Sequence, residues 1–173
     1  GGKEVAINSP VDSRNLGIGM IHQHFKLVDV FSAMDNIVLG TGGKRLGRKA
    51  LKEKIEQISR SFGLEIEPEK KIFDMSVSEK QTVEILKVLY RGAQILILDE
   101  PTRGVDVGAK AEIYSIINEL ARQGMAIIMI SSELPEIINM CDNVCVIKEG
   151  VKTGEIDHLE LTQERIMKLA TGV

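Results

Sequence analysis

The sequence predicts an α/β fold in which helices surround a parallel sheet. Two nearly continuous aliphatic runs, Ile95–Leu98 and Met125–Ser131, are typical of strands buried on both faces, because half-buried strands alternate apolar and polar residues. Strands alternate with helical patterns after residue 90, which indicates parallel pairing. Residues 32–90 are almost wholly helical in pattern, so we expect an inserted helical block beside the sheet.

The first elements can be placed from local signals. Pro10–Leu16 fits a short helix, because proline is tolerated early in a first helical turn. Ile18–Ile21 is a short strand pattern, and Gln23–Phe31 is expected to be a loop. Ser32 can then cap a helix that runs to about Leu39.

The helical block continues with two longer elements. Gly40–Gly47 is glycine-rich and basic, so it predicts a turn or solvated loop. Apolar residues recur at helical spacing over residues 48–62 and predict an amphipathic helix that stops at Gly63. Val77–Tyr90 shows the same spacing and predicts a second helix.

The remaining elements are a strand, two helices and a hairpin. They are predicted at residues 94–98 (strand), Asp106–Arg122 (helix ending at Gly124), Asn143–Lys148 with Val151–Ile156 (hairpin around Glu149-Gly150) and Thr162–Leu169 (helix).

Composition narrows the function classes. The chain has 173 residues with 43% hydrophobic and 27% charged residues, as expected for one globular domain. A net charge of −3 argues against nucleic acid as a partner. No secretory signal pattern or membrane-spanning run is present, so a membrane role requires a partner. Cys141 and Cys145 lack the spacing of a metal site and are predicted to be reduced core thiols.

Two carboxylates follow the first apolar run directly. Asp99 and Glu100 are expected at the carboxyl end of a strand, where open α/β sheets bind ligands. In a nucleotide hydrolase the first such acid holds Mg²⁺, and the second accepts a proton from the attacking water. The alternative is a core strand followed by an acidic turn. Pro101-Thr102 and the flanking segments favour the nucleotide site.

These flanking segments, taken in order, resemble the ATPase subunit of ABC transporters. The matches are Gln23 to the family's Q-loop, Ser76–Gln81 to its signature segment, Ile95–Glu100 to its Walker B strand and Asp106 to its D-loop acid. A finer resemblance to sugar and nucleoside importers rests on Met20–Leu27, Val83–Lys87 and Arg103–Lys110.

The resemblance implies an incomplete P-loop NTPase fold of the ABC ATPase type, with ATP and Mg²⁺ as cofactors. It implies a partial ABC ATPase domain over residues 1–173, with a helical subdomain at about 32–90 and a sheet core at about 91–173. The implied site residues are Glu100 and Gln23 for catalysis, Asp99 and Gln23 for Mg²⁺, and Ser76, Val77, Ser78, Glu79, Asp106 and Ser132 for the nucleotide.

Several of these residues have a structural alternative. Ser76 and Glu79 form a capping-box pattern, which alone would explain both. The functional alternative is that this helix start faces the γ-phosphate held by an opposing ATPase domain. The family's usual Leu-Ser-Gly-Gly-Gln is altered here at Met75, Val77, Ser78 and Glu79. Asp106 could simply cap a helix, and Ser132 stands where most members carry a histidine.

The P-loop pattern G-x-x-x-x-G-K-[ST] does not occur in these residues. Gly2-Lys3 and Gly43-Lys44 are followed by Glu4 and Arg45, and neither pair follows a predicted strand. The resemblance implies a P-loop N-terminal to Gly1. Without that strand and its neighbours, we expect residues 95–98 and 125–130 to lose neighbouring strands and expose apolar surface.

The two halves of the chain also resemble different parts of such importers. Residues 1–98 resemble the first ATPase half and residues 103–173 the second, so a deletion product or spliced fragment is one interpretation.

Two functions from different classes remain open. The first is the ATPase component of a sugar or nucleoside importer. Its partners would be transmembrane permease subunits, a second ATPase domain and, indirectly, a periplasmic or lipoprotein substrate-binding protein. It would lie peripherally on the cytoplasmic side of the membrane. The second is a degenerate, non-catalytic fragment that only pairs with another ATPase domain or docks on membrane subunits. An ABC-type ATPase of repair or translation is disfavoured by Met20–Leu27.

Overall fold

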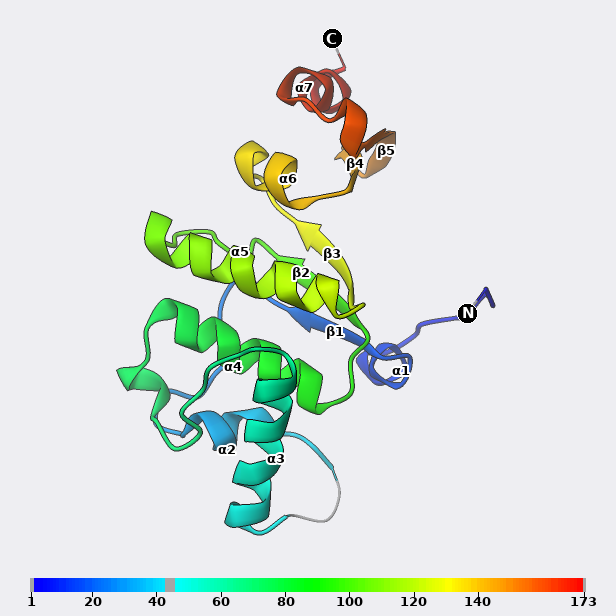
Figure 1. The fold of residues 1–173 in the computed structure, drawn as a ribbon. Coiled ribbons are helices and arrows are strands. Elements are labelled where there is room, and N and C mark those ends of the chain that lie inside the picture. The colour runs from blue at the N-terminus through cyan, green and yellow to red at the C-terminus, as the bar shows by residue number, and fades with distance from the viewer. Residues whose placement is uncertain (1, 43–45, 173) are drawn as a thin grey trace. The chain divides into compact units, whose positions relative to one another are not determined.

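The structure is a computed structural model that describes residues 2–42 and 46–172. The chain forms two compact units, Gly1–Ile130 and Ser131–Val173, which are described separately. Figure 1 shows the first unit in blue through green to yellow, ending at β3, and the second in orange-yellow to red. None of the helices in the described ranges is both long and apolar enough to cross a membrane.

The first unit is built on a parallel sheet. Its strands β1 (Ile18–Ile21), β2 (Ile95–Asp99) and β3 (Ala126–Ile130) lie in the order β1-β2-β3 (Figure 1). β2 is therefore the middle strand, with parallel neighbours on both sides. The parallel pairing predicted from the alternation of strands and helices is confirmed. The predicted loss of neighbours is wrong for residues 95–98.

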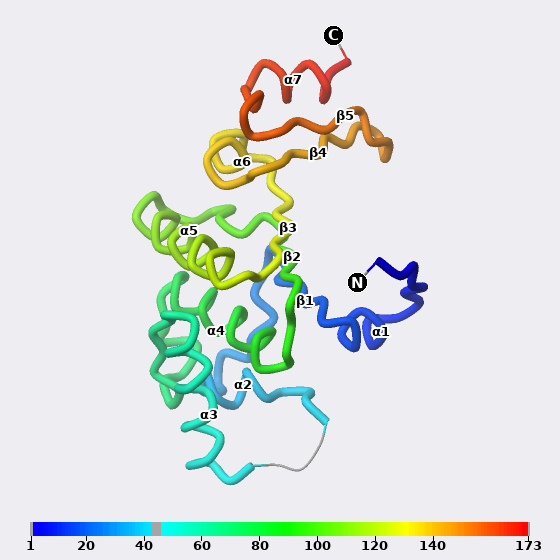
Figure 2. Tube along the Cα trace, turned by 45° about the vertical axis from the view of Figure 1, so that its right-hand side comes forward, coloured from blue at the N-terminus to red at the C-terminus, as the bar shows by residue number. Residues whose placement is uncertain are grey.

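The two faces of this sheet differ. Figure 2 shows α4 (Val77–Tyr90) and α5 (Val107–Arg122) on the same side of the strands, and on the covered face Leu96 and Leu98 are 1% and 0% exposed. On the opposite face Ile128 and Ile130 are 53% and 48% exposed. The prediction that both faces of residues 95–98 are covered holds only in part, because Ile95 and Ile97 are half-buried. Apolar exposure of the 125–130 strand, in contrast, is confirmed.

A glycine sets the distance between the sheet and its covering helix. A Cβ built on Gly19 of β1 would lie 2.0 Å from Cγ1 of Val88 in α4. No real side chain tolerates that approach, so only glycine lets the β1 backbone pack directly on α4.

The helices before the second strand follow the predicted capping signals. They are α1 (Pro10–Asn15), α2 (Ala33–Val38), α3 (Arg48–Ser61), a 3₁₀ turn η1 (Ile72–Asp74) and α4. Ser32 caps α2 by accepting from the Asp35 amide, and Gly63 follows α3 with φ of 64°. Both α2 and α3 pack on α4, so residues 33–90 form one helical block. The predicted Gly43-Lys44-Arg45 part of the loop before α3 lies outside the described residues.

The second unit is a hairpin with helices. Its elements are α6 (Leu134–Met140), β4 (Asn143–Lys148), β5 (Val151–Asp157), η2 (His158–Glu160) and α7 (Gln163–Thr171). Its core consists of Val144, Val146, Ile156 and Ile166. Glu149 and Gly150 both have positive φ, as the predicted tight hairpin turn requires. The sequence analysis missed α6. Cys145 is exposed and Cys141 half-buried, so the prediction of core thiols is wrong for Cys145.

Candidate functional site

The carboxyl edge of the parallel sheet gathers the acidic strand end and the loop that carries Gln23. β2 ends at the half-buried Asp99, and Glu100 follows it. Gln23, also half-buried, comes two residues after β1 ends at Ile21. Because β1 and β2 are parallel, with Ile21 opposite Leu98, both strand ends lie at the same edge. The structure thus brings Gln23, Asp99 and Glu100 to one side of the sheet.

Glu100 has an unusual backbone. Its φ is 49°, and the only other non-glycine residue with positive φ in the described ranges is Glu149 of the hairpin turn. The Glu100 amide donates to the Ile130 carbonyl oxygen at 2.8 Å, and its own carbonyl oxygen accepts from the Arg103 amide at 3.2 Å. Residues held in such regions cost about 1–3 kcal/mol and cluster at functional sites. The surrounding structure therefore fixes Glu100 in a conformation that its type disfavours.

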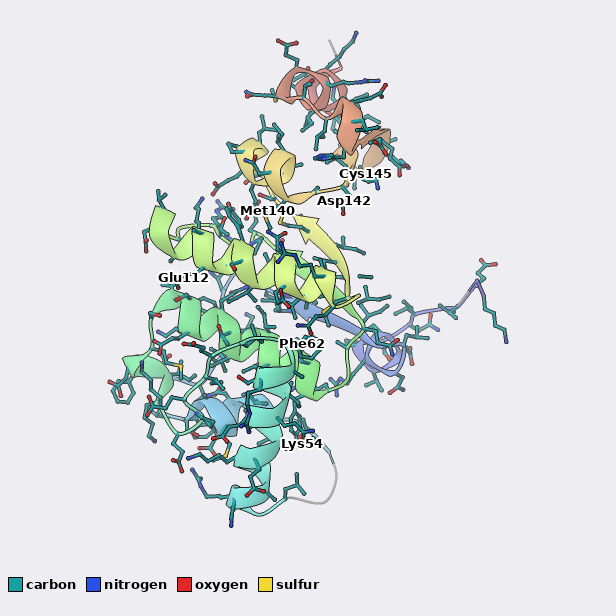
Figure 3. All side chains as sticks on the ribbon, in the orientation of Figure 1. Lys54, Phe62, Glu112, Met140, Asp142 and Cys145 are labelled. Atoms are coloured by element: carbon teal, nitrogen blue, oxygen red, sulfur yellow. The ribbon has the colours of Figure 1, made fainter. Side chains whose placement is uncertain are left out.

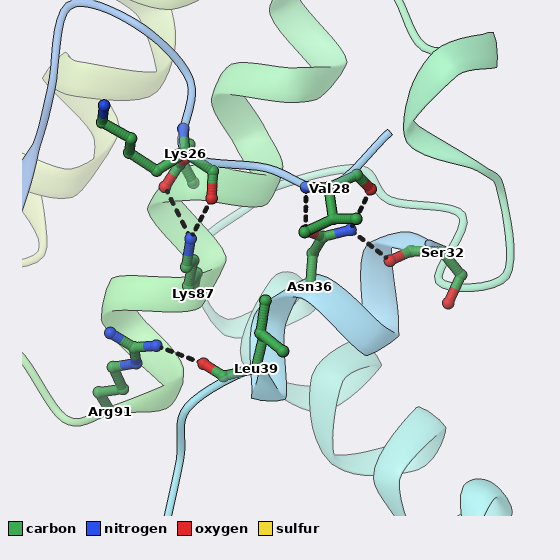
Figure 4. A network of polar contacts seen from close by, with 8 residues as sticks. Lys26, Val28, Ser32, Asn36, Leu39, Lys87 and Arg91 are labelled. Atoms are coloured by element: carbon green, nitrogen blue, oxygen red, sulfur yellow. Dashed lines mark hydrogen bonds and ion pairs between the residues drawn. The ribbon is translucent and has the colours of Figure 1, made fainter. Parts of the chain in front are cut away.

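The loop after Gln23 is fastened to α4 at Lys26. The Lys26 amide donates to Oε1 of Glu84 at 2.6 Å, and the Lys26 carbonyl oxygen accepts from Nζ of Lys87 at 2.8 Å (Figure 4). Glu84 and Lys87 form an ion pair of 3.5 Å, with side chains only 7% and 12% exposed. Both backbone polar groups of one loop residue are therefore held by a buried pair on the helix.

A second attachment fastens the same loop to α2. Asn36 is completely buried, and its Oδ1 accepts from the Val28 amide at 2.7 Å. Its Nδ2 donates to the carbonyl oxygens of Val28 at 3.1 Å and Ser32 at 3.0 Å (Figure 4). Because the loop is bound at Lys26 and Val28, Gln23 is connected within a few residues to both α2 and α4.

The predicted signature segment forms the predicted capping box at the start of α4. Oγ of Ser76 accepts from the Glu79 amide at 3.2 Å, and Oε2 of Glu79 accepts from the Ser76 amide at 2.7 Å. Val77 is 40% exposed, and Ser78 places its Oγ 3.1 Å from that of Ser76. The predicted capping-box role of Ser76 and Glu79 is thereby confirmed. Their contact with a phosphate stays a proposal.

Lys70 connects this capping box to the start of α2. Nζ of Lys70 donates to Oε1 of Glu79 at 2.6 Å, while the Lys70 carbonyl oxygen accepts from the Ala33 amide at 3.0 Å. This hydrogen bond from Lys70, followed by that from the Ser76 amide, holds the pKa of Glu79 below its ordinary value. The carboxylate at the helix start is therefore ionised and already bound within the first unit.

The two remaining predicted residues lie in different units. Asp106 caps α5, because its Oδ1 accepts from the amides of Gly108 at 3.0 Å and Ala109 at 3.1 Å. Its predicted structural role is thus confirmed, and its D-loop role stays a prediction. Ser132 is exposed in the second unit, directly after the boundary, so its relation to the carboxyl edge is not described.

The donor set at the carboxyl edge suits one predicted cofactor better than the other. The described residues contain no group of three or more His, Cys, Asp or Glu side chains placed for a metal ion. Mg²⁺ in nucleotide sites, however, uses one or two carboxylates together with phosphates, so Asp99 and the Gln23 amide suit it. A triphosphate needs a loop of close-packed N–H groups. The pattern G-x-x-x-x-G-K-[ST] that builds such a loop does not occur in residues 1–173.

A large groove opens on the helical block. It has a volume of about 970 Å³, and among its lining residues are Phe31, Leu39, Leu51 and Tyr90. Lys54 of α3, labelled in Figure 3, lies 4.4 Å from the centroid of the Tyr90 ring. The groove thus combines apolar walls with charged side chains, among them Lys54, Arg91 and Asp35.

Sequence reasoning missed the residues that hold the Gln23 loop. Glu84 and Lys87 interrupt the apolar run Val83–Leu89 three positions apart, and this placement was an available signal of a buried ion pair. Asn36 and Lys70 gave no comparable signal, because the fold alone brings them close to their partners, which are backbone groups for Asn36 and the Glu79 carboxylate for Lys70.

Comparison with known families matches residues 2–103 to the ABC transporter family. The chain belongs to the ABC transporter family. Over 174 residues it is 42% identical to the nucleoside import ATP-binding protein NupA of Lactococcus lactis subsp. cremoris, covering 99% of this chain and 34% of that protein. It is 44% identical over 181 residues to the ribose import ATP-binding protein RbsA of Bacillus subtilis, covering 99% and 36%. The chain therefore spans about a third of the length of these relatives.

Solved structures show the same fold. The ADP conformation of MJ1267, an ATP-binding cassette of an ABC transporter, superposes with a TM-score of 0.81 at 20% identity, covering 99% of this chain and 74% of the other. CbiO1 of Clostridium perfringens, part of an ABC transporter complex, superposes with a TM-score of 0.73 at 26% identity, covering 88% and 62%. The ABC ATPase fold predicted from the sequence is thereby confirmed.

Proposed function

We propose that this chain is part of the ATP-binding component of an importer for sugars or nucleosides. The observation that carries the proposal is the carboxyl edge of the sheet, where Asp99, the strained Glu100 and the loop of Gln23 come together. The relatives support this proposal along nearly the whole sequence, because the match to nucleoside and ribose import ATP-binding proteins covers 99% of the chain.

The proposed roles follow from the chemistry of each side chain. Asp99 would hold Mg²⁺ through its carboxylate, and the Gln23 amide oxygen would complete the protein ligands. Glu100 would accept a proton from the water that attacks the terminal phosphate. Bound Mg²⁺ would supply charge neutralisation. The fixed backbone of Glu100 supports this assignment, because a general base must be held in place before the reaction.

The start of α4 is the proposed contact with a second ATPase domain. α4 spans Val77–Tyr90, so its N-terminus carries a developed positive dipole end. We propose that Ser76, Val77 and Ser78 face a γ-phosphate bound by the opposing domain. Lys70 neutralises Glu79 in this position, which lowers the repulsion that a carboxylate would exert on phosphate. Asp106 would add a nucleotide contact from the first unit, and Ser132 is a separate nucleotide-binding candidate in the second unit.

The helical block is the proposed docking site for a transmembrane permease subunit. The groove of about 970 Å³ lies on this block, and its apolar wall includes the 40% exposed Phe31 and the 42% exposed Leu39. Docking there would place the chain peripherally on the cytoplasmic side of the membrane, with a substrate-binding protein reached only through the permease. The hydrogen bonds of Lys26 and Val28 with the helical block would transmit movement of this block to the loop of Gln23. The hydrogen bond from Lys70 to Glu79 would couple the start of α4 to the same movement.

Crosslinking tests the docking surface. With Cys141 and Cys145 replaced by serine, Leu39→Cys is expected to crosslink to a cytoplasmic loop of the permease because Leu39 lines the groove. Lys152→Cys, an exposed position of β5 in the second unit, serves as the control. Crosslinks that form only from residues 143–173 would refute this surface.

The second candidate is a non-catalytic chain that pairs with another ATPase domain or docks on membrane subunits. The observation that favours it is the capping box, in which Ser76 and Glu79 satisfy each other and Lys70. For the 173-residue polypeptide alone we therefore expect neither tight Mg-ATP binding nor hydrolysis.

Calorimetry and phosphate release separate the two candidates. In a longer chain that carries an intact P-loop upstream of residue 1, Glu100→Gln should keep nucleotide binding and slow hydrolysis by at least about a hundredfold, as expected for loss of a general base. Glu112→Gln, an exposed position of α5 labelled in Figure 3, is the matched control and should keep the full rate. The catalytic proposal fails if Glu100→Gln hydrolyses ATP at the rate of the control. The expectation for the short chain fails if it binds Mg-ATP at micromolar concentration.

A further inference from the structure

A second, smaller pocket lies where α1, β1 and the end of α4 meet. Its volume is about 220 Å³, and residues of all three elements line it. That volume corresponds to roughly seven water molecules, which suits a small ion with part of its hydration and is too small for a nucleotide. The carboxyl edge of the sheet, with Asp99 and Glu100, is not part of its lining.

The polar groups of this pocket are donors and cations. Among its lining residues are Ser13, Arg14, His22 and Arg91, and none of the described residues that line it carries a carboxylate. Ile18 and Val88 provide apolar wall. A pocket that offers two guanidinium groups and no acid has the charge pattern of an anion site.

Arg91 is held in place and incompletely satisfied. One terminal nitrogen, Nη2, donates to the Leu39 carbonyl oxygen at 2.7 Å, which fixes the guanidinium at the end of α2 (Figure 4). Its Nε is inaccessible to solvent and has no hydrogen-bond partner among the described residues. Because Nε is shielded from solvent, an anion in the pocket would contact Arg91 through the terminal nitrogens of its guanidinium group.

Among the described residues, no carboxylate lines the pocket or forms an ion pair with Arg91. Arg14 lies close enough to lower the pKa of Arg91, together with the larger effect of burial. Glu84 is the one carboxylate that acts on Arg91 in the opposite direction, and it already accepts from the Lys26 amide and pairs with Lys87. The two guanidinium groups therefore repel each other across a pocket that an anion would neutralise.

We propose that this pocket binds a free tetrahedral oxyanion of the size of inorganic phosphate, held between Arg14 and Arg91. Guanidinium groups bind such oxyanions through paired N–H donors, which ammonium groups do not offer. Ser13 and His22 supply further polar groups on the same wall. The site is separate from the nucleotide site proposed above and does not depend on it.

Titration of the complete 173-residue chain with inorganic phosphate, at constant ionic strength, tests the proposal by calorimetry and ³¹P NMR. We expect one saturable site, competition by sulfate and none by chloride. Arg14→Gln and Arg91→Gln should each weaken binding by about tenfold or more. Arg91→Lys should recover only part of that loss, because it restores the charge without the paired donors. Arg60→Gln, at an exposed arginine of α3 outside the pocket, removes the same charge and should change affinity by less than about twofold.

Three outcomes would overturn the proposal. They are the absence of saturation below about 10 mM phosphate, equal affinity in Arg14→Gln and the unaltered chain, and displacement of phosphate by Mg-ATP, which would assign the binding to the nucleotide site. Arg14 is exposed, so its variant keeps the test decisive even if Arg91→Gln does not fold. Tighter binding of glycerol 3-phosphate than of phosphate would overturn the assignment to a free ion.

Discussion

The two compact units differ in the contacts that stabilise each of them internally. In residues 2–130 a helix lies directly on the sheet at Gly19, and buried polar side chains bind loop backbone at Lys26 and Val28. The unit that begins at Ser131 has a two-stranded hairpin and a small apolar core that includes Val144. Most of the hydrogen bonds described for this unit are exposed to solvent.

This difference bears on where a reactive site can be built. Catalytic groups need supporting side chains that fix them within a fraction of an ångström, and the first unit offers buried support of that kind beside the loop of Gln23. A hairpin with a small core is only marginally stable by itself, so local unfolding should occur first in the second unit. The proposed catalytic residues Gln23 and Glu100 lie in the more constrained unit.

The largest expected effect concerns the two glycines that lie under a covering helix. Gly19→Ala should lower the free energy of unfolding by about 3 kcal/mol, because the new Cβ would lie 2.0 Å from the stiff β-branched Val88. Gly154→Ala in β5 also meets a neighbour, at 2.6 Å, but that neighbour is the end of the Leu169 side chain. Leu169 can rotate away, so we expect less than about 1 kcal/mol there.

Urea unfolding of both variants measures this contrast. Gly42→Ala is the control, because a Cβ at Gly42 meets nothing within 4 Å. In the double variant Gly19→Ala with Val88→Ala, part of the lost stability should return, since the clash is removed. Equal losses at Gly19 and Gly154 would show that the two units are packed alike.

Local signals in the sequence predicted most helices and strands in both units. Capping residues and helical spacing placed α2, α4 and α5, and the turn signal Glu149-Gly150 placed the hairpin. Coverage of both faces of residues 95–98 was predicted correctly only in part, because an apolar run indicates that a strand avoids water and does not show which elements cover it. Ile128 and Ile130 are apolar and yet about half exposed. The helix α6 was missed because it is short and starts at Leu134-Pro135 without a capping side chain.

The candidate site was predictable in part for a related reason. Asp99 and Glu100 follow a strand directly, so sequence order alone places them at the sheet edge. The positive φ of Glu100 and the two fastenings of the Gln23 loop depend on partners that are distant in sequence, such as Ile130 and Glu84. Such contacts carry no local signal, and only the folded structure shows them.

The next effect compares two asparagines that hold backbone groups. Asn36→Ala should cost about 2 kcal/mol, because it removes a completely buried side chain that binds Val28 and Ser32. Asn139 in α6 donates to the Pro135 carbonyl oxygen from an exposed position, so Asn139→Ala should change stability by less than about 0.5 kcal/mol. Hydrogen exchange at the Val28 amide should accelerate only in Asn36→Ala. Unchanged exchange there would mean that the Gln23 loop is held by other contacts.

The smallest expected effect concerns two ion pairs and the pH dependence that each gives to the free energy of unfolding. Hydrogen bonds from Lys70 and from the Ser76 amide lower the pKa of Glu79 in the folded chain. The stability that this carboxylate contributes is therefore present above its ordinary pKa of 4.5 and is lost as the pH falls through the lower, folded value. Lys152 likewise lowers the pKa of Glu155 in the second unit, but that pair is fully exposed and screened by solvent and salt.

Glu79→Gln should consequently flatten the fall in unfolding free energy between about pH 5 and pH 3, by a few tenths of a kcal/mol after allowance for exposure. Glu155→Gln should leave the same curve unchanged at about 0.15 M salt, where exposed charges are largely screened. Urea unfolding at several pH values measures both variants under identical conditions. If Glu155→Gln flattens the curve as much as Glu79→Gln does, the additional bond from the Ser76 amide does not distinguish the two carboxylates. The contrast between the units would then rest on packing alone.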